Sequence, residues 1–358
     1  MDLWTIIIIV SLAHSFFVIT INLIRKEYKK DEGKWLLLLL LGMFWLQLEF
    51  LSIRWPYDLG ITIFYGTRHG SWLAIGPIFF FYIKSLTGQP ILQKERLYLI
   101  PFFLFTLILP AFLDDFLTYR QVHYGMLTPF DKRPDTINFW QYLYSSVFIG
   151  QFAFLIFFII KTRTQISSYK IQIKQSYAEI EESKIKWLSA LWYGMLLILI
   201  FTTLFLVLLF FTEIYRRHMD YLYVIPSSVL VYAISYRLFG VTLQKPATSP
   251  SKYQKSGLKS EEAASYRTKL HELINSEKLY LKNGLRLQDL ADKLGITTHQ
   301  LSEVLNQHMQ TNFFDLINGY RVQEAKERIR TENQHTLLHI AHSSGFNNKT
   351  SFVNAFKR

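Results

Sequence analysis

Long apolar runs separated by short polar loops fill residues 1–240 of this chain. A helix needs about 20 predominantly apolar residues to cross a bilayer core ~30 Å thick, and most of these runs are about that long. No lysine or arginine precedes the first run and no small-residue cleavage site closes it, so we expect an uncleaved anchor. The pattern predicts a seven-helix transmembrane bundle with spans at Leu3–Ile24, Trp35–Ile53, Ser71–Leu86, Leu97–Leu117, Phe139–Ile160, Trp187–Phe211 and Tyr221–Phe239.

Basic residues are distributed unevenly between the two sets of loops that these spans would create. The loops after the first, third and fifth spans hold 14 lysines and arginines, whereas the alternate loops hold 7. Loops rich in lysine and arginine remain in the cytoplasm. We therefore expect the N-terminus outside and everything after the seventh span in the cytoplasm.

After residue 240 the pattern changes from continuous apolar runs to helical periodicity. Residues 241–260 carry prolines, serines and lysines without an apolar period, which is typical of a linker. A soluble, all-helical domain is predicted over residues 261–358, so the whole chain is expected to be all-α. Its first helix, over residues 261–281, would turn Tyr266, Leu270, Leu273 and Ile274 inward.

The stretch Leu287–His308 predicts two short helices joined by a tight turn. Ala291 is small enough for a close helix crossing, and Gly295 accepts the positive φ that the turn requires. Thr297 can cap the second helix through its hydroxyl. The inward face of that helix would carry Leu301, Val304 and Leu305, and the opposite face His299, Ser302, Glu303 and Asn306. This is the pattern of a helix-turn-helix, whose second helix enters a major groove; an ordinary helical hairpin is the alternative.

A long helix and a second copy of the motif follow. Asn312 and Asp315 predict a capped start for a helix that runs to about Arg330. Ala341 and Gly345 repeat the four-residue spacing of the first motif, and Asn347 or Asn348 can cap the next helix. The long helix is expected to bury Phe314, Ile317, Tyr320 and Ala325, and the last helix Phe352, Ala355 and Phe356. Lys349, Thr350, Val353 and Asn354 would face outward, after a turn one residue longer than the first.

Three segments in this order resemble the DNA-binding domain of the AraC/XylS family: LADKLGITTHQLSEVLN, NFFDLINGYRVQEAKERI and IAHSSGFNNKTSFVNAFKR. The segment GPIFFFYIKSLTG also looks like membrane-bound bacterial members of that family. The resemblance implies a regulator of transcription in the bacterial inner membrane whose two recognition helices enter successive major-groove segments of double-stranded DNA. It implies base contacts by Thr298, His299, Ser302, Glu303 and Asn306 in the first motif and by Lys349, Thr350 and Asn354 in the second.

The resemblance has one departure. Family members continue past the FKR position with a turn containing Gly, Thr and Pro and a closing helix, whereas this sequence ends at Arg358. Either the sequence is truncated at its C-terminal end, or the second motif lacks the element that would cover Phe352 and Phe356 and is less stable. A receptor whose helical domain binds a protein partner is the alternative function, and Glu303 favours it because a carboxylate repels phosphates, although it can accept from cytosine.

Ionisable residues at membrane depth are candidates for a signal site. Glu49 could line an outward-facing pocket with Arg68 and His69, since the third span could begin as early as Ile61. A structural hydrogen bond between helices is the alternative. A ligand of unknown chemistry, the lipid bilayer and a second copy of the chain are the further expected partners.

The loop Lys161–Lys186 carries Ile166, Ile173, Ile180 and Trp187 at seven-residue intervals. This spacing predicts a helix that extends into the cytoplasm. That helix would pack on the soluble domain or on a second copy of the chain. The alternative is an amphipathic helix lying on anionic lipid.

Composition and charge narrow the chemistry further. The 358 residues include no cysteine, which excludes disulfides and thiolate metal sites, and the net charge of +12 favours anionic partners. Residues 245–358 hold 17 Lys and Arg against 11 Asp and Glu. His335, His339 and His342 share one helical face, but no carboxylate stands nearby to complete a zinc site. No nucleophile elbow, phosphate loop or HExxH pattern occurs, so we expect no enzyme, no metal and no cofactor.

Overall fold

The computed structural model describes residues 3–54, 70–107, 139–178, 180, 182–211, 221–238, 258, 260–332 and 335–357. Within these ranges the secondary structure is helical apart from one isolated β-bridge, so the all-α prediction is confirmed for this part of the chain. The chain divides into two compact units. The first comprises Met1–Ile166 and Lys186–Thr242, and the second comprises Ser167–Ile185 and Leu243–Arg358.

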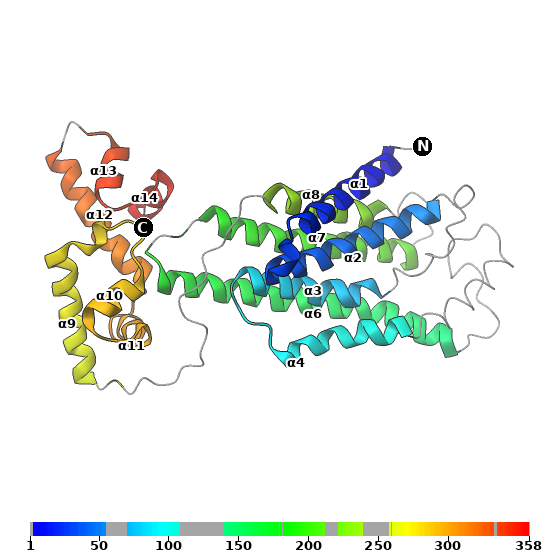
Figure 1. Ribbon diagram of the computed structural model, residues 1–358, viewed down its shortest axis with the longest axis horizontal. Helices are drawn as coiled ribbons and strands as arrows, with labels where there is room; N and C mark the ends of the chain where they lie inside the picture. Colours follow the sequence, from blue (N-terminus) through cyan, green and yellow to red (C-terminus); the bar gives the residue numbers. More distant parts are fainter. Residues whose placement is uncertain are drawn as a thin grey trace. The chain divides into compact units, whose positions relative to one another are not determined.

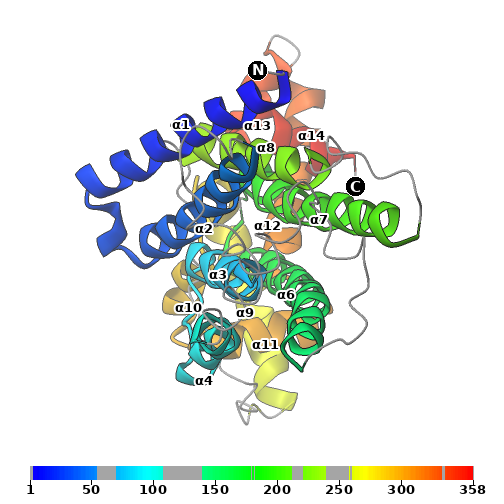
Figure 2. The ribbon, with the colours of Figure 1, turned by 90° about the vertical axis from the view of Figure 1, so that its right-hand side faces the viewer.

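Long helices form a closed ring in the first unit. α2 packs against both α1 and α3, and α1 packs against α8. Gly194 of α7 lies directly against Leu230 of α8, and Trp192 Nε1 of α7 donates to the carbonyl of Ile159 in α6 at 2.8 Å. Phe80 of α3 packs on Phe158 of α6 and closes the ring, which Figure 2 shows end-on. The helices are α1 (Leu3–Ile24), α2 (Asp31–Arg54), α3 (Ser71–Leu86), α4 (Gln93–Arg96), α6 (Phe139–Ser176), α7 (Glu182–Phe211) and α8 (Tyr221–Leu238).

Four of these helices are long and apolar enough to cross a membrane: the segments are Thr5–Ile24, Asp31–Leu51, Ile149–Ser176 and Ile185–Leu208. Ser71–Leu86 and Val224–Ser235 are apolar but shorter. Of the predicted span Leu97–Leu117, the structure describes residues 97–107, and the rest lies outside the described residues. The described residues therefore support four candidate spans directly, whereas the sequence predicts seven.

Polar side chains inside the first unit are hydrogen-bonded to one another. Ser11 of α1 donates to Gln47 of α2 at 3.0 Å, and Gln47 Nε2 reaches Ser228 of α8 at 3.4 Å. His14 of α1 stacks on Tyr232 of α8 and meets the Ser235 hydroxyl at 2.5 Å. A buried polar group needs such a partner in an apolar interior, so these bonds fix how α1, α2 and α8 pack.

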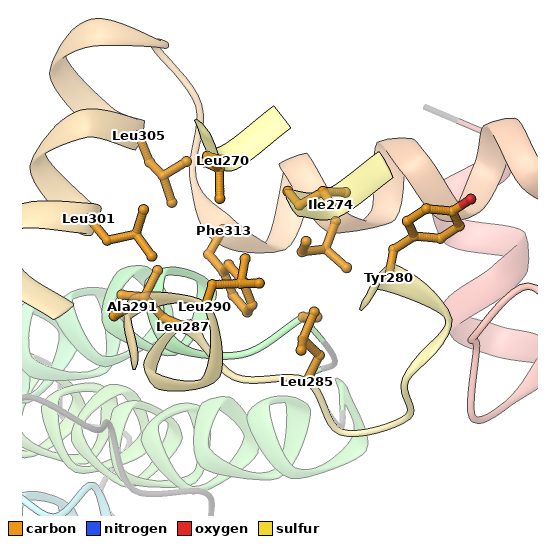
Figure 3. Packing of buried hydrophobic residues seen from close by; sticks show 12 residues of the cluster. Leu270, Ile274, Tyr280, Leu285, Leu287, Leu290, Ala291, Leu301, Leu305 and Phe313 are labelled. Atoms are coloured by element: carbon orange, nitrogen blue, oxygen red, sulfur yellow. The ribbon is translucent and has the colours of Figure 1, made fainter. Parts of the chain in front are cut away.

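The second unit is also helical (Figure 1). Its helices enclose two small hydrophobic cores. The helices are α9 (Ser260–Glu277), η4 (Leu279–Leu281), α10 (Leu287–Leu294), α11 (Thr298–Glu303), the π-helical turn η5 (Val304–His308), α12 (Phe313–Thr331), α13 (Leu337–Ser343) and α14 (Lys349–Phe356). The first core joins α9, α10, α11 and the start of α12, and Figure 3 shows its packing. The second joins the end of α12 to α13 and α14. α12 therefore carries one core near each end.

The buried faces of α12 and α14 differ from the prediction at single positions. Phe313, not Phe314, is the fully buried phenylalanine at the start of α12, because it lies four residues before the buried Ile317 on the same face of the helix. In α14, Phe352 is buried, but Phe356 is 39% exposed. Val353, predicted to face outward, packs against the second core together with Ala355. The predicted inward face of α14 is thus partly wrong.

Candidate nucleic-acid interface

The turn of the first motif is built by the backbone at Gly295. Gly295 has φ +69° and ends α10, and the N–H of Ile296 donates to the carbonyl of Ala291 at 3.0 Å. This is the hydrogen bond that a glycine-terminated helix uses to satisfy its last carbonyls. Ala291 is fully buried, as its place in the helix crossing requires.

Thr297 sets the start of α11. Its Oγ1 accepts from the N–H of Gln300 at 3.2 Å, and the Gln300 side chain accepts from the N–H of Thr297 at 3.0 Å. This reciprocal pair is a capping box, which fixes the axis along which the helix leaves the turn. The predicted cap is confirmed.

The two faces of the second helix differ as the sequence predicts. Leu301, Val304 and Leu305 are buried in full or nearly so. The residues predicted to face outward are partly exposed: Thr298, His299, Ser302, Glu303 and Asn306. The Asn306 amide donates to the Ser302 carbonyl at 2.7 Å and to the Ser302 hydroxyl at 3.1 Å. These two side chains therefore present one linked polar group.

The second motif repeats the turn of the first. Gly345 has φ +91°, and the N–H of Phe346 donates to the carbonyl of Ala341 at 3.0 Å, which is the bond made by Ile296 and Ala291. Asn348 caps α14 by accepting from the N–H of Ser351 at 2.8 Å. Asn348 lies three residues after its glycine and Thr297 two after its own, so the predicted longer turn is confirmed.

α14 presents a polar outer surface. Lys349 and Thr350 are exposed in its first turn, and Asn354 is partly exposed one turn later. Lys349 therefore offers a cation and Thr350 and Asn354 offer hydrogen-bonding groups on one short helix. Such a set suits phosphates and base edges together.

Arg321 of α12 connects the two motifs, which sequence reasoning missed. Its side chain is fully buried, and its Nε and Nη2 donate to the carbonyls of Tyr280 and Lys282 at 2.7 and 3.0 Å. The guanidinium also lies 5.7 Å from the ring centre of Phe346, next to the second turn. One side chain thus ties the loop before α10 to the turn before α14. The available signal in the sequence was an arginine placed four residues after Ile317 and four before Ala325, on the predicted inward face of the helix.

Tyr280 and Glu324 belong to a hydrogen-bonded cluster next to Arg321, and their pKa values are shifted. The hydroxyl of Tyr280 donates to Glu324 at 2.9 Å, and Glu324 pairs with Arg328 at 2.9 Å. Burial and the hydrogen bond to Glu324 raise the pKa of Tyr280 to about 12. Burial alone would raise the pKa of Glu324, but the Tyr280 hydrogen bond and the cations Arg328 and Lys278 outweigh it and lower that pKa.

His339 and His342 lie in α13, and His335 precedes this helix. His335 and His339 stack at 4.3 Å between ring centres. Among the residues that the structure describes, no group of three or more His, Asp or Glu side chains is arranged to hold a metal ion.

Glu49, the first residue of the predicted signal site, is fully buried. Arg68 and His69 lie outside the described residues. The hydrogen-bonded set of Ser11, Gln47 and Ser228 in the same unit was not predicted, because an uncharged serine or glutamine within an apolar run does not indicate a partner on another helix.

Comparison with known proteins agrees with this geometry in the C-terminal part of the chain. Residues 290–358 match a family of helix-turn-helix domains of the AraC type. This match supports a DNA-binding transcription regulator. No curated protein and no solved structure matches the chain.

Proposed function

We propose that the chain is a membrane-anchored, sequence-specific regulator of transcription that couples a membrane or extracellular signal to gene expression. The observation that carries the proposal is the pair of matching turns, at Gly295 and Gly345, within the region that matches the helix-turn-helix family. Two such turns joined by α12 would place two recognition helices on one duplex.

The residues proposed to read DNA divide by chemistry. Thr298, His299 and Ser302 would make hydrogen bonds to base edges, and Glu303 would accept from cytosine N4. Asn306 would hold the Ser302 hydroxyl in place from one turn away. In the second motif, Lys349 would meet a phosphate while Thr350 and Asn354 reach toward bases.

The proposal that residues 1–240 anchor the chain in a membrane rests on the apolar helices and on the distribution of basic residues. Four helices are long and apolar enough to cross a bilayer. The excess of basic residues in alternate loops favours a cytoplasmic helical domain, where DNA is accessible. A signal ligand would act by binding one conformation of the membrane half more tightly than another. Two copies in one membrane would raise the effective concentration of paired recognition domains.

Genome-wide DNA occupancy of the intact chain tests the proposal. We expect enrichment at a small set of promoters that share a sequence. The matched control is the His299→Ala, Ser302→Ala double variant, which retains the same apolar segments and the same buried core. It should appear in the membrane at the same level and lose that enrichment. Absence of enrichment for the unaltered chain would overturn the proposal and favour a domain that binds a protein partner.

Reporter fusions test the topology separately. A reporter that is active only in the cytoplasm, fused after Lys245, should be active. The same reporter fused within residues 114–138 should be inactive, because that loop belongs to the set with fewer basic residues. Activity at the second position would contradict the proposed arrangement.

A further inference from the structure

The second compact unit contains a short piece of chain that lies between two apolar helices in the sequence. α6 ends at Ser176 and α7 begins at Glu182, and residues Ser167–Ile185 belong to the same unit as the helix-turn-helix motifs. Tyr177 and Ala178, which we call the strap, follow directly after α6. The strap is therefore covalently continuous with a candidate membrane span while it packs inside the DNA-binding unit.

The backbone of the strap pairs with the residues that lead into α10. Tyr177 and Arg286 form an antiparallel β-bridge, and the N–H of Ala178 donates to the carbonyl of Leu285 at 3.3 Å. On the other side, the amide of Asn318 in α12 donates to the carbonyl of Ala178 at 3.0 Å. Asn318 is itself buried. Both backbone polar groups of Ala178 are thus bound by the helix-turn-helix region.

The side chains of the strap add to this attachment. Ala178 is fully buried and belongs to the first core, together with Leu290 and Ala291 of α10 and Leu301 of α11. The Arg286 guanidinium lies 5.6 Å from the ring centre of Tyr177. One turn earlier, the Lys174 ammonium lies 6.0 Å from the ring centre of Phe314 in α12. The strap thus completes the core that supports the inward face of α11.

The position of the strap indicates whether its docking would support or block DNA binding. Arg286 directly precedes α10, and its N–H is bound by Asp289 in the first turn of that helix. In the contacts of the described residues, the strap bonds Leu285, Arg286 and Asn318, which lie apart from His299 and Ser302 on the outward face of α11. Docking therefore supports α10 and α11 without occupying the face that would read DNA.

We propose that the surface formed by Leu285, Arg286 and Asn318 is a docking site for the strap of the same chain, and that docking holds the first motif in its DNA-binding arrangement. Release of the strap would loosen α10 and α11 and weaken DNA binding. Because the strap continues directly from α6, a change in the membrane half that pulls on this helix would control docking. The inference rests on the proposed function, since it names the step by which that function is regulated.

A reversible cross-link tests the proposal in the full-length chain in lipid nanodiscs. The Tyr177→Cys, Arg286→Cys variant contains the only two cysteines, because the natural sequence has none. Paired residues of an antiparallel bridge have Cα atoms ~4.5–5.5 Å apart, a separation that a disulfide can span. We expect the bond to form under mild oxidation. The oxidised form should show slower amide exchange in α10 and α11 than the reduced form, and should bind the cognate duplex at least as tightly.

A second variant undocks the strap. Ala178→Asp places a charge in the first core, so we expect faster exchange in α10 and at least tenfold weaker specific DNA binding. Leu338→Asp is the matched control, because it adds the same charge to the same unit, outside the candidate membrane spans, at a side chain that is 49% exposed. This control should behave like the unaltered chain. If Ala178→Asp unfolds the whole unit, the comparison of oxidised and reduced cross-link decides.

Three results would overturn the proposal. They are failure of the cross-link to form, weaker DNA binding by the oxidised form than by the reduced form, and Ala178→Asp behaving like Leu338→Asp. Loss of DNA binding in every variant, including the unaltered chain, would instead reject the proposed function. In that case slower exchange in the oxidised form would still establish docking, while the link between docking and DNA binding would fall with the function.

Discussion

The Nε of Arg321 donates a hydrogen bond to the backbone carbonyl of Tyr280 at 2.7 Å, across 41 positions of sequence. Nη2 of the same side chain donates to the carbonyl of Lys282 at 3.0 Å. Two carbonyls that no helix satisfies are thus paired by one buried cation. The relative placement of the two helix-turn-helix motifs depends on this side chain, because it also contacts Phe346 in the second turn.

Replacing Arg321 should therefore destabilise the joint between the motifs. Arg321→Ala leaves two carbonyls unpaired and opens a cavity, and should cost ~2–4 kcal/mol in the free energy of local opening. Arg321→Lys should recover only part of this, because an ammonium lacks the two-pronged geometry. Hydrogen exchange of the α12 and α13 amides in the full-length chain measures the effect. Arg330→Ala, at an exposed position on the same helix, is the control and should change little.

The two turn glycines should differ in their tolerance of alanine. Both have positive φ, so each substitution should cost about 1 kcal/mol from backbone strain alone. A Cβ at Gly295 would meet nothing within 4 Å, whereas one at Gly345 would lie 2.4 Å from the carbonyl oxygen of Tyr280. Gly345→Ala should therefore cost roughly 1–3 kcal/mol more than Gly295→Ala. Equal losses in hydrogen-exchange stability would mean that the second turn is free to shift away from Tyr280.

Acid should weaken the second unit through Glu324. The pKa of Glu324 is lowered in the folded chain. Its contribution to stability is therefore complete above the pKa that this carboxyl has in the unfolded chain, and is lost as pH falls through its folded pKa. Glu324→Gln should flatten this acid limb in hydrogen-exchange stability measured between pH 3 and 7. Glu327→Gln, at an exposed position, should leave it unchanged.

High pH should weaken the second unit through the hydroxyl of Tyr280, which donates to Glu324. The pKa of Tyr280 is raised to about 12, so its contribution is complete below the unfolded value near 10 and is lost as pH rises through about 12. Tyr280→Phe removes the hydrogen bond that lowers the pKa of Glu324. The midpoint of the acid limb should therefore move to higher pH in that variant. An unchanged midpoint would show that Arg328 and Lys278 alone set the acidity of Glu324.

Local signals allowed much of the second unit to be predicted from the sequence. Gly295, Thr297 and Asn312 act on the backbone within a few residues of themselves, and each takes its expected role. The prediction placed Phe314 inward, whereas Phe313 is the buried residue; both lie within one turn of Ile317, so helical spacing alone did not separate them. In the first unit, the run of apolar residues predicts helices but not which of them pack together.

Tertiary partners could not be predicted in this way. Arg321 is a charged residue whose burial depends on carbonyls far away in the chain. Ala178 and Asn318 are 140 positions apart, and neither residue type indicates a partner. The seven-residue spacing of isoleucines predicted a helix after Lys161 but left open whether it packs on protein or lies on lipid. The structure groups Ser167–Ile185 with the helix-turn-helix motifs. The residues on which this segment docks could be identified only from the structure.

Substitutions on the outward faces of α11 and α14 should distinguish base recognition from phosphate contact. His299→Ala and Ser302→Ala should each cost ~1–3 kcal/mol on the cognate duplex and little on a scrambled one, because contacts with base edges carry discrimination. Lys349→Ala should weaken binding to both duplexes alike and reduce the slope of affinity against salt by about one, as expected for a lost phosphate contact. Gln307→Ala, at an exposed position beyond the recognition face of α11, is a matched control.

Each variant is measured as the full-length chain on both duplexes at two or more salt concentrations. Equal losses on the two duplexes for His299→Ala would mean that α11 does not read sequence, and a loss confined to the cognate duplex for Lys349→Ala would move α14 from phosphate contact to base readout.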